Sequence, residues 1–411
     1  MTEQTNTPKL RFPEFSEEWE NKSITDDFSI IDGDRGKHYP SSKDLLKKGD
    51  CIFLSAENVT KKGWSFKNLK FITRKKDIAM GKGKLKLNDL ILTTRGTVGN
   101  VVRYHEEIPF QDMRINSGMV ILRTIQPSQF FLTLFTSNFM KRFLNKVTVQ
   151  SAQPHLTVAT IKMMKFIIPK NIEEQEKIGT FFSKLDQQIE LEEKKLELLE
   201  QQKRGYMQKI FSQELQFKDK VTNNFDNWSE FKIKDIFSKI ESGNRLPKSN
   251  LLDGDIPYVI AQTTNNGVYM NISKDTLDYH GNNLKKFKKG SITISIDNPD
   301  AMFIQTQDFV TSNVMRVLYN ENLSIEAHTF ILYSLRKLTQ TYNWSVKFSG
   351  PIIMDSKIKL PVKLNTNDID WNIVNKIGEF LTKLDFKIYQ NTTKVELLKQ
   401  RKKGLLQKMF V

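Results

Sequence analysis

Two stretches of the chain, residues 177–211 and 376–410, place apolar side chains at alternating spacings of four and three residues. In the first stretch these seam positions are Ile178, Phe182, Leu185, Ile189, Leu196 and Leu199; in the second they are Ile377, Leu381, Leu384, Ile388, Val395 and Leu398. Polar residues interrupt the two seams at matching places, Glu192 and Lys203 in the first, Asn391 and Lys402 in the second. A pattern of this period predicts long helices that pack along a coiled-coil seam.

The two stretches are also copies of each other. They align without a gap at an offset of 199 residues, and 18 of 35 positions are identical. Weaker matches lie upstream, where Trp19, Ile24 and Phe28 have the same spacing as Trp228, Ile233 and Phe237. A repeat this long indicates a duplicated unit made of one domain and one helix, not a solenoid.

We expect the two helices to pair with each other in antiparallel orientation, although each could instead pack only on its own domain. A helix from residue 177 to 204 is about 40 Å long, close to the roughly 34 Å of one DNA turn. This length favours a bipartite DNA site. Gly205 and Gly404 are expected to interrupt the helices, and the segments after them, 206–211 and 405–410, are either simple helix ends or, as we favour, docking surfaces for a protein partner.

The segments before the helices are rich in short β-branched runs bounded by glycine or asparagine, such as 89–94 and 291–296. Such runs are typical of strands. Helical patterns appear late in each half, near 130–144 and 325–338. The predicted fold class is therefore α+β.

Composition narrows the class of partner. The formal net charge is +16 and the pI about 9.5, a balance that suits nucleic acid best. The single cysteine, Cys51, excludes an internal disulfide and a cysteine-based zinc site, and its apolar surroundings predict a buried strand thiol. The sequence shows no signal peptide and no apolar run long enough to span a membrane, so we expect a soluble, cytoplasmic protein without a membrane partner.

No recognised catalytic motif is visible. The segment Asn298-Pro299-Asp300-Ala301 lacks the second proline and the aromatic ring of an amino-methyltransferase loop. The glycines of 33–38 have the wrong spacing for a phosphate-binding loop. The histidines are scattered, and the acidic clusters resemble turns, so we expect no metal site. An enzyme acting alone is poorly supported.

Several loops carry the residue types that read base edges, with lysine-rich runs nearby at 74–76, 82–86 and 285–289. The candidates in the first half are Ser55, Asn58, Thr94, Arg95, Thr97, Gln153 and His155. Those in the second half are Gln262, Thr263, Thr264, Asn265, Asn266, Asn298, Lys347 and Ser349. Any one of these loops could be an ordinary solvated turn; Arg95 and Gln153 are the strongest individual candidates.

These features resemble the specificity subunits of Type I restriction–modification enzymes. The resemblance covers nearly the whole chain and rests on the segment LRFPEF at 10–15, the repeated helices, the turn RGTVG at 95–99 and the loop QPHL at 153–156. It implies two tandem target recognition domains, at 10–170 and 216–365. Two antiparallel spacer helices, at 171–215 and 366–411, would link them with pseudo-twofold symmetry after a flexible segment at 1–9.

The resemblance also implies the partners. These are double-stranded DNA with a split target, two methyltransferase subunits and two restriction (motor) subunits. S-adenosylmethionine, ATP and magnesium would be held by those subunits and no cofactor by this chain. One departure is that the second half has no clear QPHL loop, and Ser349-Gly350-Pro351-Ile352 stands in its place. The alternatives are a free-standing DNA-binding regulator and an enzyme with an unfamiliar site.

Overall fold

The computed structural model describes residues 6–147, 155–215, 227–363 and 366–411. The chain forms two compact units, one made of Met1–Lys194 and Thr393–Val411, the other of Lys195–Thr392. Each unit therefore holds a strand-rich domain together with parts of both long helices. Within the described residues, no helix is long and apolar enough to cross a membrane.

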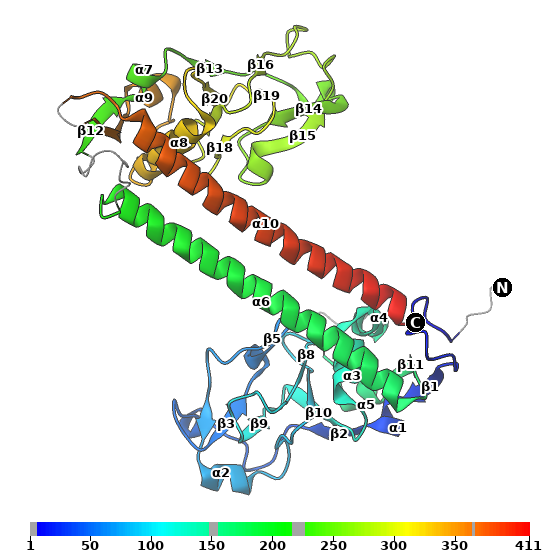
Figure 1. Cartoon of the computed structure of the whole chain (residues 1–411). Helices are drawn as coiled ribbons and strands as arrows, with labels where there is room; N and C mark the ends of the chain where they lie inside the picture. The colour runs from blue at the N-terminus through cyan, green and yellow to red at the C-terminus, as the bar shows by residue number, and fades with distance from the viewer. Residues whose placement is uncertain (1–5, 148–154, 216–226, 364–365) are drawn as a thin grey trace. The chain divides into compact units, whose positions relative to one another are not determined.

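The domain of unit 1 is built on a four-stranded antiparallel sheet, of which β2, β10 and β8 are labelled in Figure 1. Its order is β2 (Ser29–Asp32), β10 (Met119–Arg123), β7 (Leu90–Thr93) and β8 (Val101–Arg103). A second sheet has the order β6 (Phe71–Ile72), β3 (Cys51–Leu54) and β9 (Met113–Ile115), and β3 and β9 are parallel. Two further pairs join β1 (Glu20–Ser23) to β11 (Lys165–Ile168), and β4 (Val59–Thr60) to β5 (Gly63–Trp64).

The helices of this domain are short. They are α1 (Ile24–Asp27), α2 (Arg74–Ala79), α3 (Ser128–Thr136), α4 (Asn138–Val147) and α5 (Val158–Lys162), with 3-10 turns η1 (Ser42–Asp44) and η2 (Ala56–Asn58). Strand β7 begins with three apolar residues in a row, Leu90 to Leu92, because both of its faces are covered. Leu90 and Leu92 pack in the core that contains Phe130, whereas Ile91 packs in the core that contains Ile52. A strand buried on both faces loses the usual polar alternation.

The domain of unit 2 repeats this plan. Its main sheet has the order β13 (Ile240–Ser242), β20 (Met315–Leu318), β17 (Ile292–Ser295) and β18 (Met302–Ile304). Its second sheet has the order β15 (Val268–Ile272), β14 (Asp253–Val259), β19 (Phe309–Thr311) and β16 (Lys286–Phe287), and β14 and β19 are parallel. Strands β12 (Asn227–Lys232) and β21 (Lys357–Val362) pair as β1 and β11 do. The helices are α7 (Ile233–Ile236), α8 (Ile325–Thr339) and α9 (Gly350–Asp355), with 3-10 turns η3 (Lys248–Asn250) and η4 (Asn265–Gly267).

The two repeated segments form the long helices α6 (Ile172–Phe211) and α10 (Trp371–Met409). Both run through their glycines, so the expected interruption at Gly205 and Gly404 is wrong. One glycine costs about 1 kcal/mol in a helix, and helices of 40 and 39 residues that are held by tertiary packing tolerate that cost.

Within each unit the two helices run antiparallel. In unit 1, Asp186 of α6 pairs with Lys402 of α10, and further along Glu192 pairs with Lys394. In unit 2, Lys203 pairs with Asp385, and the rings of Tyr206 and Phe380 lie 5.0 Å apart. The pairs Asp186–Lys402 and Lys203–Asp385 use the same repeat positions, so the lysines that interrupt the two seams make equivalent ion pairs.

The seam residues are not equally buried. Eight of them are less than 10% exposed: Ile178, Phe182, Leu185, Ile189, Ile377, Leu381, Leu384 and Val395. The other four are half-buried: Leu196, Leu199, Ile388 and Leu398. The first turns of each helix also pack into a domain core, since Phe182 belongs to the core of Phe130 and Leu381 to that of Phe330. Pairing between helices and packing on the domain therefore occur together.

The ends of the two helices complete the domain cores. In unit 1, the ring of Phe410 lies 5.8 Å from Phe130 and 6.3 Å from Trp19. In unit 2, the repeat equivalent Phe211 lies 5.8 Å from Phe330. Ile210, Met409 and Phe410 are at most 8% exposed. Because their own domains bury them, the expected docking role is wrong for these three residues.

Candidate nucleic-acid interface

At one end of the main sheet of unit 1, loops from distant parts of the chain meet. The backbone N–H groups of Thr94 and Arg95 both donate to Gly118 O, at 2.8 and 3.2 Å. The guanidinium of Arg35 donates to Ser117 O at 3.3 Å, and Asn116 N donates to Leu54 O at 3.1 Å. Asn100 Nδ2 donates to Val59 O at 3.0 Å, and Leu156 N donates to Thr94 O at 3.1 Å. Together these contacts join segments 33–39, 55–61, 94–100, 116–118 and 155–156, which we call the loop face of domain 1, the strand-rich domain of unit 1.

The loop between β7 and β8 has a buried base and an exposed tip. Thr94 is 2% exposed, and its carbonyl accepts hydrogen bonds from Leu156 N and lies 3.1 Å from His155 Nδ1. Arg95, Thr97 and His155 are exposed. The tip therefore presents Arg95 and Thr97, while Thr94 holds the neighbouring loop. The strong candidate Gln153 lies outside the described residues.

Two candidates, Ser55 and Asn58, lie at the 3-10 turn η2, and the side chain of Asn58 is buried. Asn58 is 2% exposed; its Oδ1 accepts from Ser55 N at 2.9 Å and its Nδ2 donates to Ser65 O at 2.9 Å. This buried position does not fit the predicted base contact of Asn58. Ser55 is half-buried, and its hydroxyl also donates to Asn58 Oδ1 at 3.3 Å. The neighbour Glu57, which the sequence did not single out, is exposed on the same turn.

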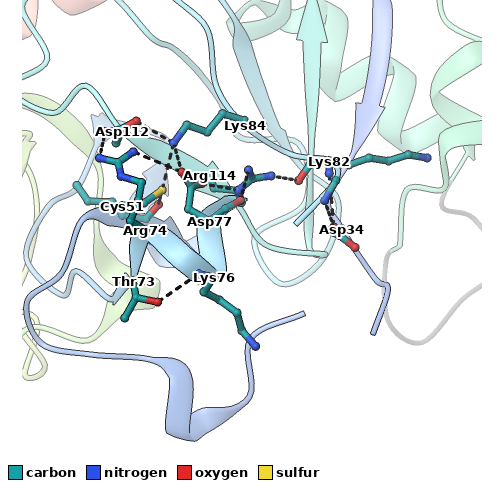
Figure 2. A network of polar contacts seen from close by, with 12 residues as sticks. Asp34, Cys51, Thr73, Arg74, Lys76, Asp77, Lys82, Lys84, Asp112 and Arg114 are labelled. Atoms are coloured by element: carbon teal, nitrogen blue, oxygen red, sulfur yellow. Dashed lines mark hydrogen bonds and ion pairs between the residues drawn. The ribbon is translucent and has the colours of Figure 1, made fainter. Parts of the chain in front are cut away.

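A polar network fixes the lysine-rich segment beside this face (Figure 2). Asp34 accepts hydrogen bonds from Gly36 N at 2.7 Å and Gly81 N at 2.8 Å, and these bonds hold the pKa of its carboxyl below the usual value. The buried Arg114 donates to Asp77 Oδ1 at 2.9 Å and also to the carbonyl of Lys82. The network thus ties loop 33–39 to residues 81–82.

The same network holds two of the nearby basic residues in ion pairs. Lys84 pairs with Asp77 at 2.7 Å and Asp112 at 2.8 Å, and Arg74 pairs with Asp112 at 2.8 Å. These two cations lower the pKa of Asp112 to about 2. Lys82 and Lys86 are exposed and remain the residues of run 82–86 that can approach a phosphate. Burial raises the pKa of the Cys51 thiol to about 12, which agrees with the predicted buried strand thiol.

Unit 2 has a corresponding loop face, formed by segments 243–247, 260–267, 296–301, 312–314 and 347–348. Phe348 N donates to Ile296 O at 2.6 Å, as Leu156 N donates to Thr94 O in unit 1. Ser349 then occupies the N-cap of α9, as Thr157 does for α5. The counterpart of His155–Leu156 is therefore Lys347–Phe348, and the expected counterpart at Ser349–Ile352 is wrong. The sequence comparison did not reveal this counterpart, because the two loops share a bulky apolar residue, Leu156 or Phe348, and not the glutamine.

The candidates on this second face also separate. Thr263, Thr264 and Lys347 are exposed. Gln262 and Asn265 both donate to Val268 O, at 2.7 and 3.1 Å, so their amides hold the loop.

The remaining candidates of unit 2 sit at turns. Asn265 and Asn266 have φ of 49° and 50°, a region that asparagine tolerates better than most residues. Asn298 is half-buried and accepts from Asp300 N at 3.1 Å, and Ser349 is half-buried at its N-cap.

Sequence reasoning missed part of the interface of domain 1. Arg35, Lys37 and His38 lie in the loop after β2, which was considered only as a phosphate-binding loop. The basic residues around Gly36 were the signal, but nothing local placed them beside residues 94–100. Among the described residues, no group of three or more His, Cys, Asp or Glu side chains is arranged to hold a metal ion.

Comparison with known proteins agrees with this geometry. Residues 16–201 and 226–398 each match the family model of the Type I restriction modification DNA specificity domain. The chain belongs to this family. It is thus a Type I specificity subunit with two DNA specificity domains, and the matched ranges each join one strand-rich domain to most of one long helix.

Individual relatives are distant. The specificity subunit of the Type I restriction enzyme MjaIX from Methanocaldococcus jannaschii is 24% identical over 339 residues, which are 78% of this chain and 76% of that protein. The specificity subunit S.BcgI of the Type II restriction enzyme BgcI from Heyndrickxia coagulans is 28% identical over 173 residues, 41% of this chain. That match spans 47% of the length of S.BcgI.

Solved structures share the fold of the specificity subunit over nearly its whole length. The crystal structure of the Type I system S subunit from M. genitalium covers 98% of this chain with a TM-score of 0.67 at 16% identity, and 99% of that chain is matched. A second structure, from work on complex assembly and conformational transition of the type I R-M system, covers 98% of this chain and 99% of its own, with a TM-score of 0.50 at 14% identity.

Proposed function

We propose that this specificity subunit supplies the address of a Type I restriction–modification complex and catalyses no reaction itself. Its two loop faces would each read one half of a bipartite DNA target. Two methyltransferase subunits and two restriction subunits would dock on it in the cytoplasm. S-adenosylmethionine, ATP and magnesium would be bound by those partners.

The observation that carries this proposal is a contrast: the two domains share a frame of sheets and long helices, but their exposed loop residues differ. The main sheets of the two domains have equivalent strand orders, and their helices make equivalent lysine–aspartate pairs. The exposed loop residues differ: the hairpin after β7 presents Arg95, whereas the equivalent hairpin after β17 presents Asp297. Arginine pairs with guanine, and acidic side chains accept from cytosine. A shared frame with different reading residues suits two unlike half-sites.

The test is to co-express the subunit with its methyltransferase subunit and map methylated adenines across the host DNA. We expect one motif with two specified halves separated by unspecified bases. Replacing residues 10–170 with those of another specificity subunit should change one half only. A contiguous motif, or changes in both halves, would contradict the proposal.

The helices offer a second test, of their role as a spacer. Inserting seven residues next to Glu192 and seven more next to Lys394 keeps the seam period, since the two residues face each other in the pair. The insertion lengthens the helices by about 10 Å, or roughly three base pairs. The gap in the motif should widen by that amount while both halves stay the same. The free-standing regulator predicts instead tight, sequence-specific binding by the isolated chain.

A further inference from the structure

The loop face of domain 1 contains a cavity of about 550 Å³ between residues 56–61 and the hairpin tip at 96–100. Ala56, Val98 and Leu144 provide apolar walls, and Glu57, Lys61 and Thr97 provide polar groups. Its shape depends on Gly99, which has φ of +89°, because a Cβ there would lie 2.5 Å from Leu144 Cδ1. The cavity is within the size range of small-ligand sites.

Glu57 is unusual among the acids of this face. Asp34 is bonded to backbone N–H groups, and Asp32, at the end of β2 next to the face, pairs with Arg35. The Glu57 carboxylate, in contrast, has no hydrogen bond or ion pair within the described part of the chain. Its backbone is nevertheless fixed, because Asn58 N donates to Ser55 O at 2.9 Å and the Asn58 side chain is buried below it. Across the cavity, the Thr97 hydroxyl likewise makes no hydrogen bond with the described residues.

An unpaired carboxylate on a DNA-reading face weakens binding, because the phosphates repel it. The unfavourable interaction is offset where the carboxylate accepts a hydrogen bond from a base. In the major groove the exocyclic amines, N4 of cytosine and N6 of adenine, are donors. Guanine O6 and thymine O4 are acceptors and would be repelled. A carboxylate therefore selects by attraction and by rejection together.

We propose that Glu57 is a specificity-determining residue of domain 1, which accepts a hydrogen bond from the exocyclic amine of a cytosine or adenine in the first half-site. Lys61 and Lys62 follow on the same loop, are exposed, and can contact the flanking phosphates. Val98 and Leu144 offer an apolar surface, which suits the thymine methyl group that accompanies adenine N6 in an A·T pair. This inference rests on the proposed function, since it requires that domain 1 read DNA.

The experiment compares the full subunit, assembled with its methyltransferase subunits, as wild type, Glu57→Ala and Glu57→Gln. The matched control is Glu106→Gln, which changes an exposed glutamate at the opposite end of the β7–β8 hairpin. The readout is the methylated motif mapped base by base, together with the thermal unfolding midpoint of each variant. Glu57 is exposed, so the midpoints should stay the same.

We expect Glu57→Ala to relax the preference at one base pair of one half-site by about 5- to 150-fold, with every other position unchanged. Glu57→Gln separates the two bases: glutamine still pairs with adenine through N6 and N7, so the preference survives if the base is adenine and is lost if it is cytosine. An unchanged motif in Glu57→Ala, or methylation lowered equally at all sites, would overturn the inference. If the wild type itself gives no bipartite motif, the proposed function fails and this inference with it.

Discussion

Four glycines of the repeated helices make a sharp test of how the domains pack on them. Gly179 and Gly378 are repeat equivalents, as are Gly205 and Gly404. A Cβ at Gly378 would lie 1.9 Å from Glu326 O and 2.5 Å from Glu326 C, at the start of α8. At Gly205, in the same unit, no atom would lie within 4 Å of it.

These surroundings give alanine opposite effects at the two sites. Replacing glycine by alanine inside a helix stabilises it by about 1 kcal/mol. At Gly205 that gain stands alone. At Gly378 the methyl group meets backbone, which moves only if α8 shifts, and overpacking of this kind costs about 1–3 kcal/mol or more. We therefore expect Gly205→Ala to be stabilising, and Gly378→Ala to be destabilising by up to about 2 kcal/mol.

Thermal unfolding of the full chain measures the difference. One kcal/mol shifts the midpoint by about 2–4 °C for a unit of this size. The midpoint of unit 2 should rise in Gly205→Ala and fall in Gly378→Ala. If Gly378→Ala were as stable as Gly205→Ala, the close approach of α8 to α10 would be refuted, because both variants receive the same gain in helix propensity.

Three further predictions test the site and its supports. Phe410→Ala should destabilise unit 1 by about 3 kcal/mol, because the ring fills the core beside Trp19; a calorimetric scan in which only unit 2 melted earlier would contradict this. Asn58→Ala should lower the free energy of unfolding by about 1–3 kcal/mol, because the Asn58 amide makes hydrogen bonds to Ser55 and Ser65. Arg95→Ala should leave the stability unchanged and reduce methylation, because Arg95 is exposed. Equal unfolding midpoints of the two variants would refute this distinction. Burial lowers the pKa of His328 below its ordinary 6.5, and its Nε2 accepts from Asn320 N only when neutral. Below pH 6.5 the unfolded chain then binds a proton that the folded chain resists, so unit 2 should lose stability as pH falls, and His328→Gln should flatten that loss.

Much of the frame could be predicted from sequence because it rests on local periodicity. The apolar seams predicted the two long helices, and short β-branched runs predicted strands β7 and β17. The prediction that glycines interrupt the helices was wrong because a glycine that a helix tolerates looks the same in sequence as one that ends it. Gly205 and Gly404 lie inside continuous helices, where packing elsewhere along the helix outweighs their cost.

The candidate site was harder to predict, since exposure is not a local property. Asn58 and Thr94 have suitable side chains, but one is buried in its turn and the other holds the loop of His155. Arg35 and Glu57 were overlooked because their neighbours on the loop face come from segments far away in sequence.

By itself, the sequence determined the duplication, the seam period, the basic charge and the family, because identical spacing and residue type can be read directly along the chain. The tertiary structure alone decided which residues face outward. It buried Phe410 against Trp19, made Lys347–Phe348 the counterpart of His155–Leu156, and left Glu57 unpaired beside a cavity. The physical reason is that burial and hydrogen bonding depend on which distant segments meet, and those meetings are set by strand pairing and core packing.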